Sequence, residues 1–280
     1  MSYLKNKINE NKIVIYHFLS VIPLLIYGCY KNGLKLYIGD LVGIGSIFYP
    51  VLCILPAALL ILFIKLIRKR DFVMNDFYMF SVLLFLPYSF NILLAVILFA
   101  VFYFLYFTKL KLPFNILFVL LLYFVGNAFG SNDILNIAES TKVYNYALHD
   151  LFIGTEVSFM FTSSFLFSII TYFILNASSY YKTLIPFVFL ISYVILTFVL
   201  GFFIDLSFMN LAGIFIAILI MGASFEFSPI TKIGMICYAI SLSVLTIICN
   251  CFIDYYIGVF VAMFILQLLS YYVVRKIFTK

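Results

Sequence analysis

Most side chains that could do chemistry lie in one polar segment of the chain, residues 129–156 (FGSNDILNIAESTKVYNYALHDLFIGTE). The segment combines four carboxylates, one of the two histidines and a run of Ser, Thr and Asn residues. Its titratable residues include Asp133, Glu139, His149, Asp150 and Glu156. In a compact protein, a loop of this length is usually functional or lacks packed structure. From the residues alone, a functional loop and a solvated connector both stay open.

The chain has five cysteines, and all of them lie within or at the ends of apolar runs. They are Cys29, Cys53, Cys237, Cys249 and Cys251. A metal or cluster site would use CxxC pairs or nearby histidines, and the sequence has neither pattern around these positions. We therefore expect the cysteines to pack as apolar side chains, predict no metal site and assign no catalytic residue.

The overall composition is typical of a bilayer protein, because 66% of the residues are hydrophobic, 10% are charged and none is Trp. Apolar runs at 51–66, 187–204 and 257–274 are long enough to cross about 30 Å of hydrocarbon at about 1.5 Å per residue. The net charge of +6 comes from Lys and Arg in short clusters at the ends of such runs. These clusters form no basic patch with interleaved aromatic residues. We therefore predict an all-α polytopic membrane protein that contacts the lipid bilayer and binds no nucleic acid.

Apolar runs that end at charged residues, Pro or Gly predict ten spans in two five-helix halves. The expected spans are 13–30, 42–64, 77–90, 91–107, 113–128, 157–175, 184–203, 207–224, 231–249 and 255–274. The third and fourth spans form one apolar stretch, which we divide near Leu86-Pro87. The chain is then a single membrane domain, 1–280, made of a first helical half (1–128), an outer polar loop (129–156) and a second helical half (157–280).

The positive charges predict the orientation of these spans. With the N-terminus inside, fourteen Lys and Arg residues lie in inner segments, and only Lys31, Lys35 and Lys142 lie outside. Cytoplasmic loops carry such an excess of positive charge. We therefore expect both termini inside and residues 129–156 outside. In this arrangement Asp254 lies in a short outer turn, where we expect it to be solvated.

Two prolines predict breaks in helices that line the interior between the halves. Proline lacks a backbone donor and clashes with the preceding turn, so it ends or bends a helix. Pro87 and Pro229 both lie in or beside apolar runs. The carbonyl groups freed before each proline would need other partners away from bulk water.

Three stretches of the chain carry a resemblance to a known family. Residues 12–35 are similar to its opening span. Residues 80–116 are similar to its leucine-rich run, Leu-Pro-Pro, helix, Gly-Lys turn and Phe-Asn-Pro, where Leu86-Pro87 and Phe114-Asn115 match. Residues 211–264 resemble its Met-Ala-Thr-Asp-Pro-Val-Thr-Ser-Pro and Gly-Tyr-Pro-Glu-Gly-Val stretch. The matching residues there are Met221, Ser228, Pro229, Tyr255, Gly258 and Val259. The family contains the flavin-carrying membrane subunits of the Rnf electron-transport complex and of the sodium-pumping NADH:quinone reductase, and the resemblance runs nearly end to end.

The resemblance implies a cofactor, flavin mononucleotide (FMN). Family members carry FMN bonded through its phosphate to a threonine in a Ser-Gly-Ala-Thr type motif, and a flavin transferase makes the bond. Here the matching segment is Glu139-Ser140-Thr141, shortly before residues 151–154, which resemble the family's Leu-Phe-Leu-Gly. The resemblance therefore places FMN on Thr141, beside Ser140, where an exposed hydroxyl can reach a phosphate. The other candidate cofactor-binding residues in matched stretches are Asn115, Thr162, Ser163, Ser164 and Ser228.

The chain departs from the family pattern in the stretch that ends at Ser164. Glycines that would let the backbone approach a phosphate or a flavin ring are replaced, and Phe159 and Phe161 occupy this stretch. Glu139 also adds a carboxylate beside the expected phosphate ester, where like charges repel.

The resemblance implies a membrane subunit of an ion-translocating, flavin-dependent electron-transport complex of the Rnf or sodium-pumping quinone reductase type. Such a subunit would lie in the cytoplasmic (inner) membrane of a prokaryote, with other membrane subunits as partners and a flavin transferase as its modifying enzyme. The protein would position the cofactor, and the cofactor would supply the redox chemistry. Two alternatives stay open. One is a cofactor-free paralogue, and the other is a small-solute channel or transporter, because the family's fold resembles that of urea channels.

Overall fold

The structure is a computed structural model. It describes residues 7–35, 44–69, 73–86, 91–106, 113–128, 152–153, 159–178, 181–201, 211–224 and 227–270. Within these ranges the fold is all-helical, with ten α-helices and no β-strand. The predicted all-α class is therefore confirmed for the described part of the chain. Thr141, Ser140 and nearly all of the polar loop lie outside the described residues.

The helices of the first half lie between residues 7 and 128. They are α1 (Lys7–Cys29) with a π-helical extension η1 (Tyr30–Lys35), the 3-10 turn η2 (Ile44–Phe48) leading into α3 (Tyr49–Arg68), α4 (Met74–Ser81) with the 3-10 extension η3 (Val82–Phe85), α5 (Ile92–Tyr106) and α6 (Phe114–Ala128). The helices of the second half are α9 (Phe165–Asn176), α10 (Leu184–Leu200), α11 (Leu211–Ala217) with the π-helical extension η4 (Ile218–Gly222), α12 (Lys232–Phe252) and α13 (Gly258–Leu269).

Each of the ten predicted spans corresponds to one of these helices, in the same order. Three helical stretches, Lys12–Leu34, Tyr49–Ile67 and Lys232–Phe252, are long and apolar enough to cross a membrane by length and composition. The other apolar helices among the described residues have 10–17 residues. The outer helices also expose large apolar side chains, such as Leu59 (55% exposed) and Phe63 (63%) on α3 and Phe198 (63%) on α10. Such a surface suits contact with lipid.

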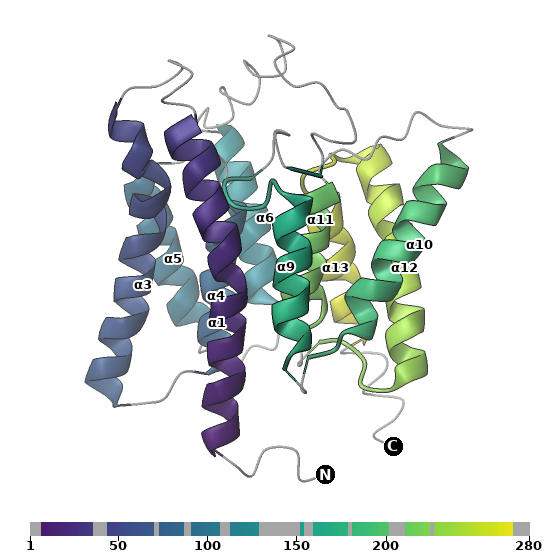
Figure 1. Ribbon diagram of the computed structural model, residues 1–280, viewed down its shortest axis with the longest axis horizontal. Helices are drawn as coiled ribbons and strands as arrows, with labels where there is room; N and C mark the ends of the chain where they lie inside the picture. Colours follow the sequence, from purple (N-terminus) through teal and green to yellow (C-terminus); the bar gives the residue numbers. More distant parts are fainter. Residues whose placement is uncertain are drawn as a thin grey trace.

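The two halves repeat the same packing arrangement. In the first half α1 packs on α4, α3 on α5, and α6 on both α5 and η3. In the second half the equivalent contacts join α9 with α11, α10 with α12, and α13 with both α12 and α11. The halves meet through α1 with α9, α6 with α13, and α4 with η4. Figure 1 shows the first half in purple and blue beside the second half in green and yellow.

A short helix stands at the centre of each half, α4 with η3 in the first and α11 with η4 in the second. Every residue is buried over 76–86 and again over 212–224. A helix that is apolar on all sides belongs in the interior of a larger assembly of helices. These two buried helices therefore form the core of their halves: α1, α3 and α6 pack against the first, and α9, α10 and α13 pack against the second.

The predicted breaks at the two prolines have different outcomes. The first buried helix does end near the expected place, because η3 stops at Phe85 and Leu86 is extended, with φ −66° and ψ 131°. Pro87 itself lies outside the described residues. The second prediction is wrong in position, because η4 ends at Gly222 and Pro229 lies in the connection to α12. The second helix ends several residues before Pro229, so the proline ring is not what ends it.

Candidate functional site

The C-terminal ends of the two buried helices carry polar contacts within the described interior. The last carbonyl groups of a helix have no partner within the helix, and away from water each needs another donor. In the first half, two backbone groups of residues 159–164 meet this need. The Phe161 N–H donates to the Leu84 carbonyl oxygen at 3.3 Å, and the Met160 N–H donates to the Leu86 carbonyl oxygen at 3.0 Å.

Residues 159–161 are held against the end of α1 as well as against η3. The side-chain amide of Asn32 donates to the carbonyl oxygen of Met160. A Cβ atom at Gly28 would lie 2.8 Å from the same carbonyl oxygen and would overlap the ring of Phe161. Only glycine lets α1 pass this close to the segment. The end of η3 is thus closed by main-chain contacts.

In the second half, side chains from other elements bind the carbonyl groups at the end of η4. The Tyr181 hydroxyl donates to the Leu219 carbonyl oxygen at 2.6 Å. From α13, the Gln267 side-chain amide donates to the Met221 carbonyl oxygen at 2.9 Å. Gln267 is fully buried, which is costly for an amide unless it makes such bonds. At the end of η4, polar side chains therefore bind the carbonyl groups in addition to the backbone N–H groups of Ala223 and Ser224, whereas the end of η3 is bound by backbone groups of residues 159–164.

Lys182, in the short connection between α9 and α10, binds the backbone carbonyl groups that follow the end of η4. Its ammonium group donates to the Ser228 hydroxyl at 2.7 Å, to the Ser228 carbonyl oxygen at 3.0 Å and to the Ser224 carbonyl oxygen at 3.4 Å. Burial lowers the pKa of Lys182 to about 8, because it disfavours the charged amine. At neutral pH the amine is still mostly protonated. A positive charge therefore lies against two carbonyl groups and a hydroxyl.

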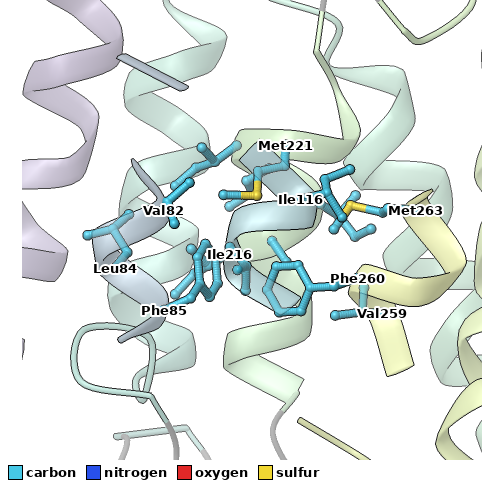
Figure 2. Close-up of a cluster of buried hydrophobic side chains, with 14 of the residues drawn as sticks. Val82, Leu84, Phe85, Ile116, Ile216, Met221, Val259, Phe260 and Met263 are labelled. Carbon is cyan, nitrogen blue, oxygen red and sulfur yellow. The ribbon is translucent and has the colours of Figure 1, made fainter. Parts of the chain in front are cut away.

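Between the two closed ends, apolar side chains fill the centre of the molecule. Figure 2 shows side chains from η3, α6, α11, η4 and α13 meeting there. The labelled residues are Val82, Leu84, Phe85, Ile116, Ile216, Met221, Val259, Phe260 and Met263. All nine are at most 1% exposed. The described centre is a packed apolar core, which offers no polar lining to a hydrophilic solute.

An aromatic cluster joins this core to residues 159–164. The ring of Phe159 lies 5.9 Å from Phe85, 6.4 Å from Tyr123, 6.0 Å from Tyr256 and 6.2 Å from Phe260, between ring centroids. All four pairs are close to edge-to-face, which is a favoured geometry for aromatic rings. Phe159 thus contacts both halves, and its ring is 4% exposed.

The sequence-predicted site residues are distributed over separate elements. Thr162, Ser163 and Ser164 are neighbours just before α9, and all three are at most 1% exposed. None of their hydroxyl oxygens has a hydrogen-bond partner. Asn115 lies in the first turn of α6 and is buried, while Ser228 lies beyond η4 and binds Lys182.

The described candidate residues do not form a site with the shape or the donors that FMN needs. The three hydroxyl groups before α9 have almost no accessible surface, and Phe159 and Phe161 are packed beside them in the core. A phosphate group needs open space and donors in reach, and a flavin ring needs a wide slot. The described residues around Thr162 therefore do not fit this cofactor. Thr141, the expected attachment residue, lies outside the described residues.

Sequence reasoning missed the residues that close the helix ends. From sequence, Lys182 predicts only topology, although a lysine between two short apolar runs is close to the interior. Gln267 gives a usable signal, because an amide within an apolar span usually has a bonding role. Asp76 was missed too. It is fully buried on α4, where it accepts a hydrogen bond from the Tyr103 hydroxyl at 2.8 Å and from the Val73 N–H at 3.1 Å.

The expectation that Asp254 is solvated is met only in part. Asp254 is only partly exposed, and the Tyr123 hydroxyl donates a hydrogen bond to its carboxylate. A charge in a short turn would favour water unless a donor nearby replaced it. Tyr123 on α6 supplies that donor from the other half of the molecule.

Comparison with known proteins adds no assignment to this geometry. No family model matches the chain, and no curated protein matches it.

Proposed function

We propose that the chain is a membrane subunit of an ion-translocating, flavin-dependent electron-transport complex of the Rnf or sodium-pumping quinone reductase type. The observation that carries the proposal is the closed pair of buried helices. Each half is built around a short buried helix, and donors from elsewhere in the chain satisfy carbonyl groups at its end. Such a rigid body suits a subunit that anchors partners and holds a cofactor at its edge. The resemblance in residues 80–116 and 211–264 supplies the kind of complex.

The proposed topology follows from the repeat and from the charges. Five crossings in each half give the halves opposite orientations, the arrangement of an inverted repeat. The positive-inside rule then places both termini in the cytoplasm and residues 129–156 outside. In this arrangement Thr141 lies on the outer face of the cytoplasmic membrane of a prokaryote, where a flavin transferase could attach FMN.

The channel alternative has less support from the geometry. A solute pathway along the two buried helices would need open polar groups near their ends. The carbonyl groups of Leu84, Leu86, Leu219 and Met221 are already bonded, and the centre between the helices is apolar (Figure 2).

A cofactor-free paralogue is the second candidate, and the packing of two phenylalanines favours it. Phe159 is at the centre of the aromatic cluster, and Phe161 is 1% exposed against Gly28. Both lie in a stretch where the family that the chain resembles has glycines. A protein that keeps the helical body without the flavin would show this pattern.

One experiment separates the two candidates. The chain is coexpressed with a flavin transferase, purified, denatured and inspected for flavin fluorescence in a gel, with an established family member as the positive control. The flavin proposal predicts a fluorescent band that disappears in Thr141→Ala and persists in Thr155→Ala, which removes another hydroxyl of the same loop. A dark wild-type band beside a fluorescent control would exclude covalent flavin and leave the cofactor-free subunit.

A further inference from the structure

The environment of Lys182 is that of a coordinated cation. Among the contacts of the described residues, three oxygen atoms lie 2.7–3.4 Å from its ammonium nitrogen, namely two backbone carbonyl oxygens and one hydroxyl. The Ser224 carbonyl oxygen also accepts hydrogen bonds from the Ser228 N–H and hydroxyl. Backbone carbonyl oxygens replace the hydration shell of a potassium ion in the same way. We call the set formed by the Ser224 carbonyl, the Ser228 carbonyl and the Ser228 hydroxyl the oxygen cradle.

The position of the cradle in the fold also favours a positive charge. It lies directly beyond the C-terminal end of the helix formed by α11 and η4. Aligned peptide dipoles make this end of a helix partially negative. In membrane transport proteins, the C-terminal ends of interrupted helices and unwound backbone carbonyl groups bind cations for this reason.

One further oxygen atom of a cradle residue has no hydrogen-bond partner. The Ser224 hydroxyl oxygen is buried without a hydrogen bond, although its residue supplies one of the cradle carbonyls. Ser224 is 2% exposed, so water does not solvate this hydroxyl from outside. A buried hydroxyl usually bonds something.

The equivalent end of the first buried helix is built differently. There the Leu84 and Leu86 carbonyl groups accept backbone N–H groups instead of an ammonium group. The two buried helices therefore end differently in this fold, and among the described residues an ammonium group binds carbonyl oxygens only beyond the second.

We propose that the oxygen cradle is a binding site for a monovalent cation of ammonium size, and that the Lys182 ammonium group is the cation that occupies it in this structure. When the Lys182 side chain is removed, potassium, ammonium and methylammonium have the charge and size to take the place of its ammonium group. This inference is independent of the flavin proposal, because it concerns the end of η4 and involves neither residues 159–164 nor a redox step.

The test uses the full-length chain, purified in detergent at pH 7, with Lys182→Ala as the main variant. Alanine removes the ammonium group and leaves space for a free cation, whereas Lys182→Met removes the charge and keeps the space filled. The unfolding temperature is followed with a thiol-reactive dye after the exposed Cys237 and Cys251 are replaced by serine in every variant, because Cys53 and Cys249 are buried in the folded protein. Potassium or methylammonium chloride is titrated against choline chloride at equal ionic strength, since choline is too large for the cradle.

We expect a saturable rise in the unfolding temperature of Lys182→Ala with potassium or methylammonium. At a cation concentration ten times the dissociation constant, the folding equilibrium shifts about eleven-fold, which corresponds to about 3 °C. Wild type and Lys182→Met should show no difference between these salts and choline. The double variant Lys182→Ala/Ser228→Ala should lose most of the effect, because one ligand is gone.

Equal curves in potassium, methylammonium and choline for Lys182→Ala would overturn the proposal. So would a cation effect of the same size in Lys182→Met or in the double variant, since the cation would then bind elsewhere. If Lys182→Ala is folded only when it is prepared in methylammonium, the proposal is supported. If it is unfolded with and without methylammonium, the cradle does not accept a free cation and the proposal fails.

Discussion

The Tyr123 hydroxyl on α6 donates a hydrogen bond to the carboxylate of Asp254, in the turn between α12 and α13. The two residues belong to different halves of the molecule. The other carboxylate oxygen of Asp254 accepts the Tyr256 N–H at 3.0 Å. Tyr123 and Tyr256 both also contact the ring of Phe159. One carboxylate thus holds together two tyrosines and, through them, the aromatic cluster at which the halves meet.

Removing this bond should loosen the contact between the halves. In Tyr123→Phe the carboxylate loses a partly buried donor, and hydrogen bonds to charged groups contribute about 1.5–3 kcal/mol. We expect the free energy of unfolding in mixed micelles to fall by about that amount. Tyr16→Phe is the matched control, because Tyr16 is 43% exposed on the outer side of α1 and should change the value by less than about 0.5 kcal/mol. Equal effects of the two substitutions would show that the Asp254 bond does not stabilise the fold.

The Gly258 position provides a second test of packing between helices. A Cβ atom there would lie 2.9 Å from the Asn250 backbone nitrogen, 3.1 Å from the Cys249 carbonyl carbon and in overlap with the Asn250 side-chain oxygen. Backbone atoms of α12 cannot move away without displacing the helix. Gly258→Ala should therefore destabilise the protein by about 1–3 kcal/mol. Gly45→Ala is the control, since a Cβ atom at Gly45 meets nothing within 4 Å. A Gly258→Ala protein as stable as Gly45→Ala would contradict the close approach of α12 and α13.

The helices could be predicted from sequence because hydrophobic runs and their interruptions are local signals. The predicted span 113–128 and the observed helix Phe114–Ala128 differ by one residue at the start, where Pro113 immediately precedes the helix. The span 157–175 starts too early, because hydrophobicity alone cannot show that Phe159 and Phe161 precede the helix in a non-helical segment. That segment is fixed by backbone bonds to Leu84 and Leu86, far away in the chain.

The polar contacts of the candidate site could not be predicted, for the same physical reason. The partners of Asp254 and Lys182 are chosen by the folded arrangement of helices and not by spacing along the chain. Asp254 is bonded by a tyrosine from the other half, and Lys182 by carbonyl groups that only become available where η4 ends. A carbonyl group has no sequence signature, since every residue carries one.

The proposed topology can be tested by labelling single cysteines from one side of the membrane. Cys237 and Cys251 are exposed in the structure, so all native cysteines are first replaced by serine or alanine. Asn145→Cys in the outer loop should react with a membrane-impermeant maleimide added to intact cells, and Lys69→Cys should react only after the cells are opened. The reverse pattern would overturn the orientation with both termini inside.

Lys182 predicts a specific dependence of stability on pH. Burial lowers its pKa in the folded protein to about 8, compared with about 10.4 for an unperturbed lysine. Between these two values the unfolded chain binds more protons than the folded one, so the free energy of unfolding rises with pH in this window. The gain is at most about 1.4 kcal/mol per pH unit. Tyr181, its neighbour, does not titrate there, because burial raises its pKa well above the usual value.

We expect the stability of wild type relative to Lys182→Met to increase from pH 8 to pH 10, measured by unfolding in mixed micelles at constant ionic strength. A relative stability that falls over this range would mean that the oxygen atoms around the ammonium group and the nearby helix end outweigh the desolvation of the charged amine.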